Sequence, residues 1–169
     1  RRVDTLRTKL LSLGFTEAPL VELEEIATSS RDILARAQAA RQLALWNMRL
    51  KTEDGFRTAL KLIKIAREFA PDLDFRRKLA VSEVLCHHFM GENEAAKKAG
   101  DIAIGKGELH PDLLLALAST ETSEDARLRF INRALALCNV PALALRPDDG
   151  SPAYNRLTCE ENLPKIKDG

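Results

Sequence analysis

The spacing of hydrophobic and polar residues predicts helices joined by short polar turns as far as about residue 140. The clearest helix lies between Phe56 and Phe69, where charged residues recur at positions i, i+4, i+7 and i+11 and mostly hydrophobic residues fill the rest. Such a helix has a narrow solvated stripe, so we expect neighbouring elements to cover it on two sides. The same pattern predicts further helices over residues 3–13, 19–26, 31–50, 75–90, 92–105, 112–119 and 124–138.

One unit occurs twice: an alanine-rich helix, a short turn with glycine, a second helix and a closing proline, over residues 40–71 and again over 80–111. The turn glycines Gly55 and Gly91 lie 36 residues apart (91 minus 55), and the closing prolines lie 40 apart (111 minus 71). Helix pairs that recur at about 34 to 47 residues are typical of tetratricopeptide and related α-solenoid arrays. The sequence therefore predicts an all-α fold of antiparallel helix pairs, stacked as a short tetratricopeptide-like α-solenoid.

The helical pattern ends near Val140. A third predicted pair, over 112–138, is shorter than the first two, as terminal members of a repeat array tend to be. Beyond it, four prolines break any helical period. We therefore expect a helical-repeat domain over 1–140 and an extended linker or tail over 141–169 that leads to a further domain. The lack of a starting methionine also favours a fragment or a processed chain.

Composition narrows the classes of partner. Lysine and arginine total 26 and aspartate and glutamate total 25, a formal net charge of +1. Nucleic-acid binders usually carry a basic excess, so we expect no nucleic-acid partner. No run approaches the ~20 apolar residues that span a bilayer, so we expect no membrane span. The three cysteines, Cys86, Cys138 and Cys159, are odd in number and have no CxxC spacing, which favours a reducing, cytoplasmic setting.

Three short segments contain residues that could support chemistry, and each has an ordinary structural explanation. Adjacent side chains of Cys86-His87-His88 would point about 100° apart on a helix, so they cannot easily share one metal ion. Asp72-Leu73-Asp74 matches the DxD pattern of some sugar-transferring enzymes, yet helix capping explains it. Residues 148–151, Asp-Asp-Gly-Ser, are typical of a turn. We expect no catalytic constellation, metal site or cofactor in this chain.

Four segments give a resemblance to a known family. Residues 126–135, 140–145 and 154–157 resemble the helix and linker before the catalytic domain in some bacterial family 2 glycosyltransferases. Residues 44–66 are similar to the tetratricopeptide-like region of the same proteins. The resemblance implies that the parent protein transfers a sugar from a nucleotide-sugar donor, in polysaccharide or cell-surface glycan synthesis. It also implies that this chain ends before the catalytic domain, so it assigns no catalytic or donor-binding residue here.

Three classes of function follow. The first is a non-catalytic helical module of such a glycosyltransferase, which binds a protein partner, a second copy or its own C-terminal catalytic domain. The second is a free-standing tetratricopeptide-type adaptor for a peptide or protein. The third, a small all-α enzyme or metal protein, is disfavoured by the geometry of residues 86–88. First helices of repeat pairs usually line the concave side of a solenoid, so the predicted partner-binding residues are Arg36, Arg41, Trp46, Arg77, Glu83 and His87.

Overall fold

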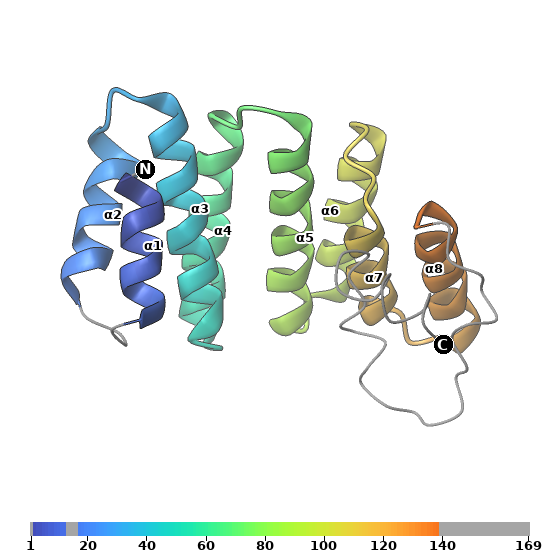
Figure 1. Cartoon of the computed structure of the whole chain (residues 1–169). Helices are drawn as coiled ribbons and strands as arrows, with labels where there is room; N and C mark the ends of the chain where they lie inside the picture. The colour runs from blue at the N-terminus through green and yellow to red at the C-terminus, as the bar shows by residue number, and fades with distance from the viewer. Residues whose placement is uncertain (1, 13–16, 139–169) are drawn as a thin grey trace.

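The computed structural model describes residues 2–12 and 17–138, with side chains over 2–8 and 18–138. These residues form eight α-helices and no strand, which confirms the all-α prediction (Figure 1). The predicted tail over 141–169, including the turn at 148–151, lies outside the described residues. In chain order the helices are α1 (Arg2–Ser12), α2 (Glu17–Ser29), α3 (Ile33–Arg49), α4 (Glu53–Glu68), α5 (Leu73–Phe89), α6 (Asn93–Gly105), α7 (Pro111–Thr120) and α8 (Glu124–Leu137).

Most helices begin at a side chain that accepts a hydrogen bond from a backbone N–H of the first turn. Such caps satisfy donors that have no partner inside the helix. At α3, the carboxylate of Asp32 accepts from the N–H groups of Leu34 and Ala35 at 3.0 and 3.1 Å, so this helix begins two residues later than predicted. The other capping side chains are Thr52, Asp72, His110 and Ser123.

Of the two glycines predicted to lie in turns, one follows the end of a helix and the other lies inside a helix. Gly91 has a φ of 76°, the left-handed conformation that glycine adopts without steric cost, and it ends the α5 unit as predicted. Gly55, however, lies inside the first turn of α4, and the left-handed residue of that connection is Lys51, with a φ of 53°. A Cβ on Gly55 would lie 2.6 Å from the carbonyl oxygen of Asn47, so glycine there allows α4 to approach α3 closely.

From α3 onward the helices follow one another along the stack, with the α1–α4 group at one end, the α6–α8 group at the other and α5 between them (Figure 1). Contacts are extensive within the pairs α3–α4, α5–α6 and α7–α8, and short turns reverse the chain within each pair. The α4 helix also packs against α5, which confirms that it is covered on two sides, and α5 packs in turn against α7.

Three hydrophobic clusters run through the stack. The largest joins α1–α5 around fully buried leucine and isoleucine side chains, and alanines such as Ala39 and Ala59 allow close helix contact. The second joins α5, α6 and α7, and the third joins α7 and α8. Residues 113–118 of α7 are all buried, so this short helix is interior to the described stack. Burial of each such leucine contributes about 1.5–3 kcal/mol of transfer free energy.

Candidate interaction surface

The six predicted partner-binding residues are all partly exposed, and they lie on two adjacent helices. Arg36, Arg41 and Trp46 are on α3, and Arg77, Glu83 and His87 are on α5. They do not form one patch. Arg36, Glu83 and His87 make polar contacts inside the chain, Arg41 and Arg77 each have an Nε atom without a hydrogen-bond partner, and Trp46 is a partly exposed residue of α3.

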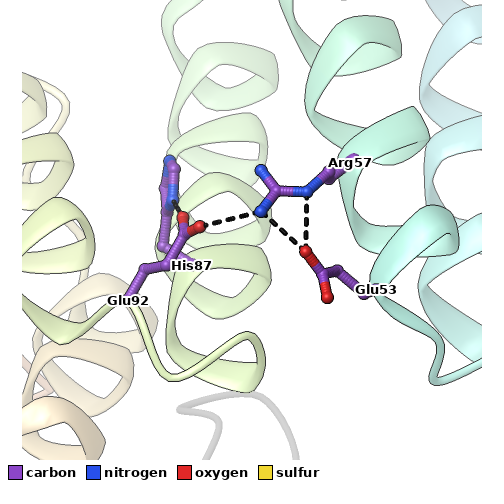
Figure 2. A network of polar contacts seen from close by, with 4 residues as sticks. All are labelled: Glu53, Arg57, His87 and Glu92. Atoms are coloured by element: carbon purple, nitrogen blue, oxygen red, sulfur yellow. Dashed lines mark hydrogen bonds and ion pairs between the residues drawn. The ribbon is translucent and has the colours of Figure 1, made fainter.

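His87 belongs to a polar network at the end of α5 (Figure 2). Its Nδ1 lies 2.7 Å from a carboxylate oxygen of Glu92, and Arg57 Nη2 donates to the other oxygen at 3.3 Å. Arg57 also donates to Glu53 at 2.9 and 2.7 Å. The hydrogen bond from His87, and then the charges of Arg57 and His87, lower the pKa of Glu92. This network connects the start of α4 to the turn between α5 and α6.

The Cys86-His87-His88 segment places its three side chains in different surroundings. Cys86 is a buried free cysteine, and burial together with the charge of Glu83 raises the pKa of its thiol to about 12. His87 pairs with Glu92, whereas His88 Nδ1 lies 3.2 Å from the side-chain oxygen of Asn93. No group of three or more potential metal ligands occurs among the residues the structure describes.

The two carboxylates of the DxD-like segment likewise serve the start of α5. Asp72 accepts from the N–H of Phe75 at 2.8 Å, and Asp74 forms an ion pair with Lys78 at 2.7 Å. The hydrogen bond from Lys78 is the main cause that lowers the pKa of Asp74, and the charges of Lys78, His110 and Arg77 act in the same direction. The predicted capping role of Asp72 is confirmed.

Glu83 takes part in a partly buried ion cluster that connects three parts of the chain. Arg67 on α4 donates from Nη1 to both carboxylate oxygens of Glu108, at 2.8 and 2.7 Å, and from Nη2 to Glu83 at 3.0 Å. Glu108, in the loop between α6 and α7, is only 2% exposed. Burial opposes the charge of Arg67, but hydrogen bonds and charges from Glu108 and Glu83 raise its pKa. We call Arg67, Glu83 and Glu108 the Arg67 cluster.

Sequence reasoning missed Arg67 and Glu108. The two residues are 41 positions apart, and no helical periodicity relates residues on different elements at that separation. The pair of Glu53 and Arg57 could have been found, since an acidic and a basic residue four apart on a helix face commonly pair.

Arg36 is also engaged inside the chain. Its guanidinium carbon lies 4.3 Å from the centre of the Phe69 ring, a cation–π distance. Its Nε donates to the carbonyl oxygen of Ala27 at 3.4 Å, so Arg36 connects α3 to the end of α2 and the end of α4.

Arg41 and Arg77 differ from these residues, and we call them the arginine pair. Both are half-buried, and the Nε atom of each is buried without a hydrogen-bond partner. Among the described residues, neither guanidinium group forms an ion pair. Burial lowers the pKa of Arg41, and the positive charge of Arg7 lowers it further against the opposing charge of Asp74.

The surroundings of the arginine pair combine positive charge with an aromatic ring. The guanidinium carbon of Arg41 lies 5.8 Å from the ring centre of Phe75, two residues before Arg77 on α5. Asp74 interacts electrostatically with both arginines but is paired with Lys78. The positive charges of Arg7, Arg41 and Arg77 are therefore not balanced by an ion-paired carboxylate within the described part of the chain.

Among the described residues, no helix has both the length and the apolar character needed to cross a membrane. No family model matches the chain, and no curated protein or solved structure is detectably similar to it.

Proposed function

We propose that this chain is a non-catalytic interaction module, a short tetratricopeptide-like stack in which α3 and α5 meet a protein partner. The observation that carries this proposal is the arginine pair: two partly exposed side chains on adjacent helices that form no ion pair within the described residues. Arginine is enriched at protein–protein interfaces, so an arginine at a partly exposed position without an internal ion pair supports a binding role.

The residues whose side chains could take part in catalysis support a binding role instead. The thiol of Cys86 is buried with its pKa raised to about 12, so it is a poor nucleophile near neutral pH. His87 and Asp72 form contacts that connect or begin helices. Each of these residues thus has a structural use.

The parent protein, in this proposal, is a bacterial glycosyltransferase of polysaccharide or cell-surface glycan synthesis, and the module acts in the cytoplasm. Its partner is another protein, a second copy or the catalytic domain that follows. The support is the resemblance of residues 44–66, 126–135, 140–145 and 154–157 to that family. The reading frame beyond Gly169 tests it. A continuation with a nucleotide-sugar-binding domain is expected, and a stop codon would instead favour a free-standing adaptor.

A photo-crosslinking experiment tests the binding role itself. A photoreactive amino acid replaces Trp46 on α3 or Lys78 on α5, and Lys64 on the solvated stripe of α4 serves as the control position. Irradiation of cells that make the full protein is expected to give adducts of defined size at the first two positions and not at Lys64. Adducts absent from all three positions, or equal at all three, would contradict a specific interaction through α3 and α5.

A further inference from the structure

The helices at the two ends of the described stack differ in charge. The α2 helix lies at one end and α8 at the other (Figure 1). The α2 sequence, EAPLVELEEIATS, contains four glutamates and neither lysine nor arginine. The α8 sequence, EDARLRFINRALAL, contains three arginines, and its two acidic residues are confined to the first turn. Both helices lie apart from α3 and α5, so a role for them does not depend on the proposed function.

The exposed face of α2 is acidic and includes an apolar residue. Leu23 and Ala27 are buried in the first hydrophobic cluster. Val21, Glu24 and Glu25, spaced i, i+3 and i+4, lie together on the exposed side of the helix, and Val21 is 62% exposed. Because α2 packs mainly against α3, this side points away from the stack.

The exposed face of α8 is basic and likewise includes an apolar residue. Ile131 and Leu135 are buried in the cluster that joins α8 to α7. Arg129, Arg133 and Leu137, spaced i, i+4 and i+8, lie on the exposed side, and Leu137 is 46% exposed. Among the described helices, α8 makes its main contacts with α7, so this side also points away from the stack.

The charges on these two faces are not used inside the described part of the chain. Glu24 and Glu25 form no ion pair there, and neither do Arg129 and Arg133. Each face therefore keeps two like charges and one large apolar side chain in contact with solvent. The α2 face has the opposite charge to the α8 face, and both are present in every copy of the chain.

We propose that the α2 face of one copy binds the α8 face of a second copy, so that the chains associate head to tail. Opposite potentials on two surfaces favour their association and fix which surface meets which. A contact between different faces of identical chains is heterologous and leaves one face of each kind free at the ends, so further copies can add. In a helical-repeat stack, such a contact places one helix beside the next and continues the array.

The association should be weak and sensitive to salt. A contact between single helices is smaller than a standard protein–protein interface, so it should become visible at protein concentrations of roughly 0.1 mM. Sedimentation velocity of the full chain at low salt is expected to show a mean mass that rises with protein concentration. Added salt should return it to the monomer, because exposed charges are screened.

Charge reversal tests which faces are involved. E24R/E25R makes the α2 face basic, and R129E/R133E makes the α8 face acidic. Each variant alone is expected to associate at least about tenfold more weakly than the wild type, because its two faces then carry the same sign of charge. The matched control K61E/K64E reverses two exposed lysines on α4 and should associate within about twofold of the wild type.

Mixing the two variants tests the head-to-tail arrangement itself. The basic α8 face of E24R/E25R matches the acidic α2 face of R129E/R133E, and their other two faces match with reversed signs. An equimolar mixture should therefore associate although neither variant does so alone. A contact between two α2 faces or between two α8 faces would be abolished by only one of the variants.

Three results would overturn the proposal: a wild-type chain that stays monomeric at low salt and high concentration, association unchanged in both variants, or a mixture that remains monomeric. Loss of association in only one variant would overturn it in favour of a symmetric contact. Should E24R/E25R fail to fold by circular dichroism, E24Q/E25Q removes the charge alone and is expected to weaken association by about threefold or more. E24Q/E25Q association equal to wild type would then also overturn it.

The two proposals can fail separately. Photo-crosslinks at Trp46 and Lys78 together with a monomeric chain would retain the interaction module and remove the head-to-tail contact. Head-to-tail association without those crosslinks would retain the contact and remove binding through α3 and α5.

Discussion

Arg67 and the arginine pair lie in the same helical stack, yet their guanidinium groups have opposite surroundings. Arg67 is enclosed by two carboxylates, one of them on the nearly fully buried Glu108. Arg41 and Arg77 are half-buried without an ion-paired carboxylate within the described residues. The same residue type thus joins helices by ion pairs in one region and forms no ion pair in the other, where the nearby carboxylate of Asp74 is paired with Lys78.

The largest loss of stability is expected at Arg67, whose guanidinium group is paired with two carboxylates. Arg67→Met removes the partner of Glu108 and leaves a buried carboxylate uncompensated, which destabilises proteins by about 3–5 kcal/mol. Urea unfolding followed by circular dichroism measures the loss. The double variant R67M/E108Q should regain part of it, because no buried charge then remains. An Arg67→Met variant as stable as the wild type would show that the Arg67 cluster does not stabilise the packing of the helices.

A related effect should appear at Cys86, which lies on α5 between Glu83 and His87. Its buried thiol with a pKa of about 12 should resist a thiol reagent at neutral pH until the fold opens. Arg67→Met is expected to speed labelling of Cys86 about a hundredfold, the factor that corresponds to ~3 kcal/mol. Peptide mapping by mass spectrometry follows this cysteine alone. Rapid labelling of Cys86 in the native wild type would contradict its burial.

A much smaller change is expected at the arginine pair. In Arg41→Gln the repulsion from Arg7 is lost together with the contact with the Phe75 ring and the attraction of Asp74, so the free energy of unfolding should change by less than about 1 kcal/mol. Urea unfolding under the conditions used for Arg67→Met gives a direct comparison. A loss of more than about 1 kcal/mol would mean that Arg41 is a structural residue like Arg67.

The smallest effect concerns the exposed network of Figure 2. The lowered pKa of Glu92 means that its pairing contributes fully at pH values above the ordinary carboxyl pKa and is lost as pH falls through the lowered value. His87→Ala should move the pKa of Glu92 upward toward its ordinary value, as an NMR titration of its side chain would measure. Thermal stability at neutral pH should barely change, since the network is exposed. An unmoved pKa would show that His87 does not stabilise the carboxylate.

The contrast also shows what the sequence can and cannot predict. Helix positions follow from local periodicity, and Asp72 follows from capping chemistry, so both were predictable from neighbouring residues. The placement of Gly55 was predicted wrongly, because a glycine can serve a close helix approach as well as a turn. The pairing of Arg67 with Glu108 depends on how helices stack across 41 positions, which no local pattern encodes. Arg41 and Arg77 were predicted as partner-binding residues, and that role stays a prediction. The finding that their Nε atoms have no hydrogen-bond partner required the structure.

The position of Glu108 also bears on how the stack comes apart. In a simple repeat array each unit touches only its neighbours, so the ends can fray one unit at a time. Here the loop that precedes α7 is bonded to Arg67 on α4, across the whole α5–α6 pair. Local unfolding of α7 and α8 would therefore also disturb the bond between Glu108 and Arg67 on α4. This bond should make the stack melt as one cooperative unit rather than in successive steps from its C-terminal end.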